Sequence, residues 1–138
     1  MDTWVNQGIG VDCEEIVPYL SIEKVRAILT NNYPDDDFSE VTSMEMAREA
    51  ILDLYRGGIA EMLAEIDEHN LVVWGTDSDR TDGFLLYPPR YPWEHSENDP
   101  KSQEEARELI KRLVRQACDI DEMTLDNLVQ EVYEIASM

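Results

Sequence analysis

A short polar segment, DSDRTDG at residues 77–83, has residue types that could bind a calcium ion. A calcium loop of the EF-hand kind places oxygen ligands at positions 1, 3 and 5, a glycine at position 6 and a bidentate glutamate at position 12. Asp77, Asp79 and Thr81 match the first three positions, but the glycine comes one residue late and position 12 is Pro88. The segment therefore predicts a polar hairpin loop, with adventitious cation binding as the alternative.

The two histidines do not predict a metal site. His69 follows Glu65 by four residues and would share a helix face with it, whereas His95 lies in a loop beside Glu94 and Glu97. A protein zinc site needs three or four converging ligands, and no second histidine or cysteine reinforces either pair. We expect His69 to end a helix, where it favours the helix dipole, and we assign no metal ligand.

Sequence motifs of catalysis are also missing. The chain contains no G-x-S-x-G, no P-loop and no dinucleotide fingerprint, and the glycines of residues 7–10 are too few to hold a phosphate. Cys13 and Cys118 have neither metal-ligand nor C-x-x-C spacing, and neither has an obvious basic partner nearby in the sequence that would activate it. We expect reduced, buried thiols, with a disulfide left open, and we assign no catalytic residue and no cofactor. A small enzyme or metal-binding protein remains the third hypothesis.

Charge is the strongest compositional signal. The 138 residues include 31 acids against 11 lysines and arginines, which gives a net charge of −20. Residues 1–70 hold 16 of the acids and only 4 of the bases. Such a chain should avoid DNA, RNA and anionic membranes and should be attracted to basic surfaces.

A row of carboxylates is the best candidate for an interaction surface. Glu45, Glu49 and Asp53 follow one another at four-residue spacing, about 6 Å apart along a helix. Like charges at this spacing destabilise a helix modestly, but they can imitate the phosphates of a nucleic acid, which lie about 3.4 Å apart on each strand. The alternative is a solvated face that keeps the protein soluble. Residues that could extend the row are Asp35, Asp36, Asp37, Glu40, Glu61 and Glu65.

A proline-rich segment, YPPRYPW at residues 87–93, supplies candidate anchors for a partner. Its P-x-x-P spacing is typical of polyproline segments that dock into aromatic grooves. Tyr91 and Trp93 belong to residue types favoured at protein interfaces. The alternative is that these aromatic residues pack over the sheet of their own domain.

Helix signals divide the first half of the chain. Ser21 is a predicted N-cap before apolar residues at helical spacing, and Asp12 is predicted to cap a short turn. Thr42 and Glu45 have the spacing of a capping box for the next helix. The apolar face of that helix changes direction at residues 57–58, both glycine, so we predict a kink or break there.

The second half begins with strand signals. Residues 71–75 and 83–87 predict a β-hairpin, and a short strand is expected near residues 4–5. Ser102 and Glu105 predict the cap of an amphipathic helix, and a last helix is expected from Thr124 through Ile135. The predicted fold class is α+β, mainly helical, with about four to five helices and one β-hairpin or small antiparallel sheet, in a single domain over residues 1–138.

These features predict a small acidic binding protein. We expect it to inhibit a nucleic-acid-binding enzyme, such as a nuclease, by occupying its basic surface. In its composition the chain is similar to phage anti-restriction and anti-CRISPR inhibitors and to nuclease immunity proteins. The alternative is a non-catalytic adaptor or assembly protein that uses its amphipathic helices. Without a signal peptide or an apolar run of about 20 residues, a cytoplasmic protein is expected.

Overall fold

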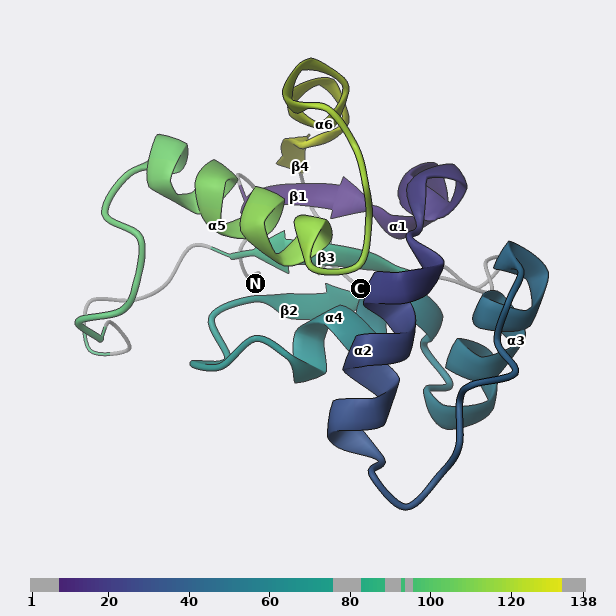
Figure 1. Cartoon of the computed structure of the whole chain (residues 1–138). Helices are drawn as coiled ribbons and strands as arrows, with labels where there is room; N and C mark the ends of the chain where they lie inside the picture. The colour runs from purple at the N-terminus through teal and green to yellow at the C-terminus, as the bar shows by residue number, and fades with distance from the viewer. Residues whose placement is uncertain (1–7, 76–82, 89–92, 94–95, 133–138) are drawn as a thin grey trace.

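The computed structural model describes residues 8–75, 83–88, 93 and 96–132, which form helices packed on one small sheet (Figure 1). The α+β prediction is confirmed, with six α-helices in the described part of the chain. The elements are, in order, β1 (Gly8–Asp12), α1 (Cys13–Ile16), the 3-10 helix η1 (Val17–Tyr19), α2 (Ile22–Asn32), α3 (Met44–Leu54), α4 (Gly58–Glu65), β2 (Val73–Gly75), β3 (Phe84–Tyr87), α5 (Gln103–Arg115), α6 (Glu122–Leu128) and β4 (Gln130–Val132).

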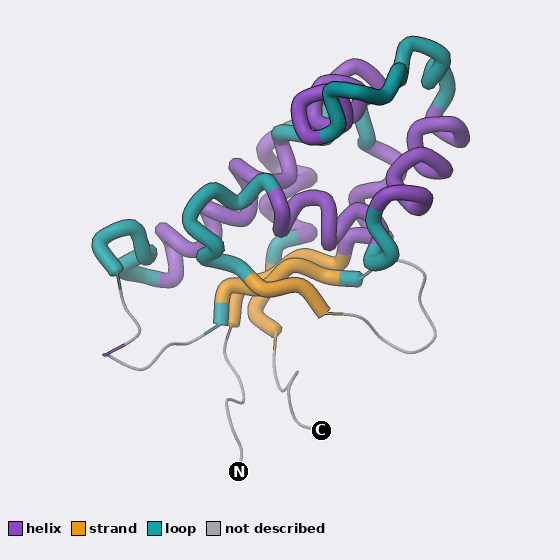
Figure 2. Tube along the Cα trace, turned by 90° about the horizontal axis from the view of Figure 1, so that it is seen from below, coloured by secondary structure: helices purple, strands orange, loops and turns teal. Residues whose placement is uncertain are grey.

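The sheet has the order β2-β3-β1-β4, and every neighbouring pair is antiparallel. The helices lie over one of its faces (Figure 2). Because side chains alternate between the faces of a strand, Ile9, Val11 and Leu85 point into the core beneath the helices. The predicted hairpin is confirmed, since Val73 pairs with Leu86 and Gly75 with Phe84.

The core draws on every layer of the fold. Fully buried aliphatic side chains come from α2, α3, α4 and α5, among them Leu29, Ile51, Leu63 and Ile110. Each such side chain contributes roughly 1.5–3 kcal/mol when it leaves water. The amphipathic spacing in the sequence therefore predicts correctly which faces of α2, α3 and α5 are buried.

Helices α3 and α4 are separated at the two glycines, as predicted. Gly58 has a φ of 69°, a left-handed conformation that costs other residues roughly 1–2 kcal/mol. A Cβ atom on Gly57 would lie 2.6 Å from the ring of Trp74. Both positions therefore require glycine, one for its backbone conformation and the other for the space that Trp74 fills.

Helix caps follow the sequence with one correction. Asp12, Ser21 and Ser102 accept hydrogen bonds from the backbone N–H groups of Glu14, Lys24 and Glu105, at 3.0, 3.2 and 3.1 Å. The N-cap predicted at Thr42, with Glu45 as its capping-box partner, was wrong by one residue. Ser43 is the N-cap of α3 and accepts from the N–H of Met46 at 3.1 Å, so Glu45 lies inside the first helical turn.

The last predicted helix is shorter than expected. It ends at Leu128, Val129 is extended (φ −88°, ψ 115°), and Gln130–Val132 joins the sheet as β4 beside β1. A short apolar run fits both helix and strand spacing, and the pairing of β4 with β1 decides between them. Ile135 and the strand expected near residues 4–5 lie outside the described residues.

Candidate protein-interaction surface

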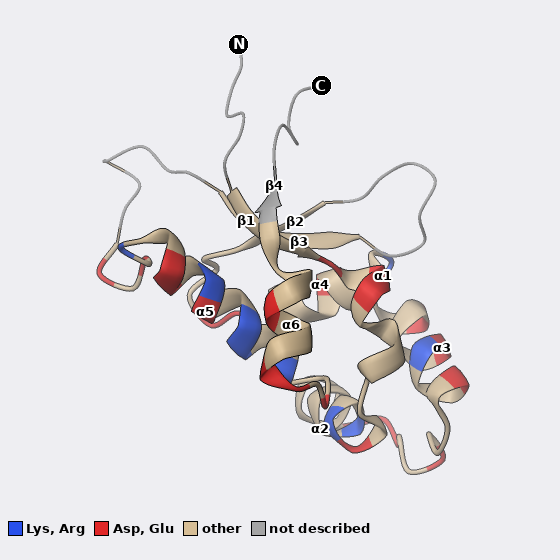
Figure 3. Ribbon diagram, turned by 90° about the horizontal axis from the view of Figure 1, so that it is seen from above, with Lys and Arg blue, Asp and Glu red and all other residues tan. Residues whose placement is uncertain are grey.

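Seven carboxylates gather at one end of the molecule. They lie on the connection between α2 and α3 and on α3 itself, and all seven residues are exposed. Figure 3 shows the acidic stretches of both segments together, at the end away from the N-terminus of α5. We call this set the acidic end: Asp35, Asp36, Asp37, Glu40, Glu45, Glu49 and Asp53.

Helix α3 presents its acids outward because its apolar residues face the core. Ala47 and Ile51 are fully buried, and Glu45, Glu49 and Asp53 lie on the opposite side. Two apolar side chains share that outer side: Met46 is 39% exposed and Leu52 is 38% exposed. The row predicted from the sequence is therefore present, and it has apolar neighbours that the sequence analysis did not single out.

The connection before α3 is held in place by local hydrogen bonds. The side chain of Val41 is buried, and its carbonyl oxygen accepts from the guanidinium of Arg26 at 3.3 Å. The carboxylate of Asp37 accepts from the backbone N–H of Ser39 at 2.9 Å. This bond lowers the pKa of Asp37, so the carboxylate stays charged. Between α2 and the connection lies an open depression of about 630 Å³, lined in part by Asp36 and Asp37.

The ion pairs of the described residues do not involve the acidic end. None of its seven carboxylates forms an ion pair with a residue in the described ranges. These ion pairs lie elsewhere: they join α5 to α6, and one links Lys24 of α2 to Asp119 at 3.0 Å. The acidic end is therefore a group of neighbouring exposed carboxylates that form no ion pair with described residues.

Glu61 and Glu65, which were expected to extend the row, have local roles. The carboxylate of Glu61 accepts from the backbone N–H of Gly57 at 2.7 Å, at the start of its own helix α4. Glu65 interacts with the phenol of Tyr55, whose ring is buried and whose oxygen accepts a hydrogen bond from the side-chain nitrogen of Asn32 at 3.1 Å. Burial raises the pKa of Tyr55, and the carboxylate of Glu65 raises it further. These contacts link both carboxylates to residues at the junction of α3 and α4, and their part in an extended row stays a prediction.

A cluster of ion pairs between α5 and α6 was not predicted. Lys111 of α5 is buried, and its ammonium contacts Glu108 at 3.1 Å, Asp126 at 3.2 Å and also Glu122. We call these four residues the Lys111 cluster. Glu122 raises the pKa of Lys111, and Lys111 together with Arg115 lowers the pKa of Glu122 to about 2. Only the Glu108–Lys111 pair, three residues apart on one helix, was visible in the sequence.

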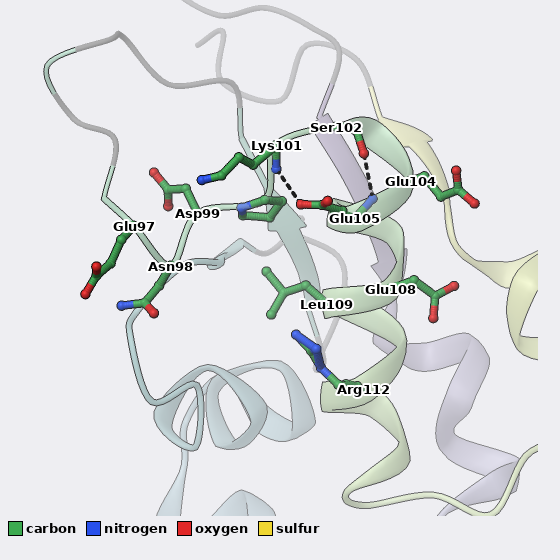
Figure 4. A pocket seen from close by; sticks show the side chains of 11 residues that line it. Glu97, Asn98, Asp99, Lys101, Ser102, Glu104, Glu105, Glu108, Leu109 and Arg112 are labelled. Carbon is green, nitrogen blue, oxygen red and sulfur yellow. Dashed lines mark hydrogen bonds between the residues drawn. The ribbon is translucent and has the colours of Figure 1, made fainter.

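Two open cavities line α5. The first, about 700 Å³, lies between the turn at residues 97–101 and the start of α5 (Figure 4), and the second, about 530 Å³, shares Asn98, Leu109 and Arg112 with it. Several of the acids around them already accept hydrogen bonds: Glu105 from the N–H of Lys101 at 2.8 Å, and Asp99 from that of Ser96 at 3.0 Å. Across the described ranges, no three potential ligands converge on a metal-sized site.

The other candidate residues lie apart from the acidic end. His69 was expected to end a helix, but α4 ends at Glu65, and His69 lies four residues beyond it with its Nδ1 3.3 Å from the side-chain nitrogen of Asn98. Cys13 and Cys118 are buried free thiols, and burial raises the pKa of Cys118 to about 12, which keeps it from acting as a thiolate. Trp93 is 78% exposed, whereas Tyr91 and residues 77–82 of the calcium-like segment lie outside the described residues.

Two further findings bear on the class of protein. In the described segments, no helix combines the length and the apolarity needed to cross a bilayer. Comparisons with models of protein families, with curated proteins and with solved structures found no match to this chain. The case for a function therefore depends on the surface described above.

Proposed function

We propose that the protein binds a basic surface of a nucleic-acid-binding enzyme, such as a nuclease, and blocks the access of nucleic acid to it. The observation that carries this proposal is the acidic end, where seven exposed carboxylates lack an ion pair with any described residue. Like charges held together cost stability in the free protein. A cationic partner would remove that cost on binding.

Charge would act mainly on the rate of encounter. Attraction between complementary potentials speeds association by about 10- to 1,000-fold, and salt weakens the effect. The net charge of −20 gives the chain the field that such steering needs. Tight binding then requires apolar contacts from which water is excluded. Met46 and Leu52 lie among the acids of α3 and could make such contacts.

The alternative of an adaptor drew on the apolar side of the last helix. Leu125 is fully buried and Val129 nearly so, and the Lys111 cluster holds α6 against α5. These apolar side chains are used within the chain's own core. The acidic end is therefore the surface that we favour for a partner.

A capture experiment with matched charge variants tests the proposal. The immobilised protein is incubated with an extract of the organism that encodes it, at low and at high salt, and captured proteins are assayed for nucleic-acid binding. We expect a protein that binds nucleic acid and loses this activity when the acidic protein is added. The variant Glu45→Lys, Glu49→Lys, Asp53→Lys should lose capture by tenfold or more, as a rough expectation for close charge pairs.

The control variant changes net charge equally but at another place. Glu68, Glu97 and Glu104 are exposed and line the cavities beside α5, so reversing all three to lysine should reduce capture much less. Equal losses in the two variants would show that only overall charge matters and would remove the acidic end as the site. Capture that is unchanged between low and high salt would contradict steering.

A further inference from the structure

Helix α6 buries little apolar surface. It has seven residues, and among them only Leu125 is buried. Val129 is buried directly after the helix, and Leu128 is partly buried against the core. In Figure 1, α6 stands at one edge of the molecule, beyond β1 and β4. Because a helix this short is not stable alone in water, its place depends on what else holds it.

Charge supplies much of that hold. Arg107, Lys111 and Arg115 follow one another at four-residue spacing along α5. Every ion pair that the described residues form between α5 and α6 joins one of these cations to Glu122 or Asp126. Arg107 Nη1 also donates to the backbone carbonyl of Asp126 at 3.1 Å. The side chains of Glu122 and Asp126 are 62% and 51% exposed, so salt can screen these ion pairs.

The connection between α5 and α6 is fastened as far as Asp119. Lys24 of α2 donates to the carbonyl oxygens of Arg115 and Cys118, both at 2.9 Å, and its ammonium pairs with Asp119 at 3.0 Å. The N–H of Asp119 donates to a carbonyl oxygen of η1 at 2.9 Å. A boundary between the fastened chain and the segment held by charge therefore falls between Asp119 and the start of α6.

Strand β4, which follows α6, is also attached on one side only. It has three residues, lies at the edge of the sheet and pairs with β1 alone among the described strands. Strand β1 pairs with β3 as well, from Ile9 to Asp12. The sheet would therefore keep its three other strands if β4 left it.

We propose that α6 and β4, residues 122–132, form a latch that opens as one unit while the other helices and the sheet stay folded. Proteins open locally in such units where few buried apolar contacts hold a segment. Opening breaks the ion pairs with α5 and the pairing with β1. It uncovers the three cations of α5 and the edge of β1, both of which the latch covers when it is closed. This inference does not depend on the proposed function.

Hydrogen exchange of the full chain, followed by mass spectrometry, tests the latch. The double variant Glu122→Gln, Asp126→Asn removes both charges with little change in volume. Hydrogen bonds between charged groups are among the stronger ones in proteins, so peptides of α6 and β4 should exchange roughly tenfold faster than in the wild type. Peptides of α2 and α4 should keep their rates. Equal acceleration in all peptides, or none in α6 and β4, would overturn the proposal.

A matched variant separates local from overall charge. Glu97→Gln with Glu104→Gln changes the net charge equally at exposed positions outside the latch and should leave the exchange of α6 and β4 unchanged. The same acceleration in this variant would overturn the proposal.

Salt tests the latch in the wild type, without any substitution. At about 1 M, where the Debye length is about 3 Å, peptides of α6 and β4 should exchange faster relative to those of α4 than at low salt. A constant ratio would show that charge does not hold the latch closed.

Discussion

The region of α5 and α6 and the acidic end are both rich in carboxylates, but they use them differently. In the first, Glu108, Glu122 and Asp126 surround the buried ammonium of Lys111. In the second, the carboxylates face water and form no ion pair with described residues. The same residue type thus supports folding in one region and opposes it in the other, which is the pattern expected if the second region serves a partner.

The largest effect should come from removing the cation of the Lys111 cluster. Lys111→Met keeps most of the side-chain volume but leaves three carboxylates close together. Removing one partner of a buried ion pair costs about 3–5 kcal/mol, and the lower end applies here because the three carboxylates are 51–62% exposed. We expect a loss of about 3 kcal/mol, measured by urea denaturation.

The matched control for this change is the next residue on the same helix. Arg112 is exposed, so Arg112→Met should alter the free energy of unfolding by less than about 0.5 kcal/mol. Equal losses in the two variants would mean that charge in α5, and not the buried position of Lys111, stabilises the fold. The contrast between the two regions would then lose its basis.

A smaller effect should appear in the dependence of stability on pH. The pKa of Glu122 is lowered in the folded chain from 4.5 to about 2. A carboxyl with a lowered folded pKa contributes stability that is complete above its unfolded pKa and is lost as the pH falls through the folded one. The stability difference between the wild type and Glu122→Gln should therefore be constant above about pH 5.5 and shrink between pH 4.5 and pH 2.

Dilute samples followed by tryptophan fluorescence suit this measurement, because the chain approaches its isoelectric point of about 4.1 in the same range. The double variant with Lys111→Met is the control. Lys111 is the main cause of the lowered pKa, so the pH-dependent difference should diminish in that background. A difference that keeps its size would assign the effect to another group.

The smallest effect should have the opposite sign and lies in the acidic end. Glu49 stands four residues from both Glu45 and Asp53, so Glu49→Gln removes two like-charge contacts. Each such contact costs about 0.2–0.5 kcal/mol, and the variant should gain about 0.5 kcal/mol, measured by urea denaturation at low salt. High salt should reduce the gain by screening the repulsion. A loss of stability would reveal an attractive partner for Glu49 and would weaken the proposal.

The sequence predicts the features that depend on neighbouring residues. The caps at Asp12, Ser21 and Ser102, the break at residues 57–58 and the outward row of α3 follow from local spacing, and the structure has all of them. The acidic end was expected for the same reason, since its residues are close together in the chain.

The features that were missed depend on residues distant in sequence. The pairing of Lys111 with Glu122 and Asp126 requires the packing of α6 on α5, and β4 forms because β1 offers it an edge. The contact between Glu65 and Tyr55 also depends on how α4 meets the end of α3. Helical spacing describes a face of a helix, but it does not say which other element covers that face.

The pairing of Gly8 with Val132 places the first and last described residues of the chain beside one another in the sheet. In Figure 3 this edge lies at the side of the molecule away from the acidic end. The segments before Gly8 and after Val132 therefore begin beside one another, at a place in the sheet away from the carboxylates of α3, which suits this place for joining a reporter without covering them. Capture through the N-terminus and through the C-terminus should consequently retrieve the same partner.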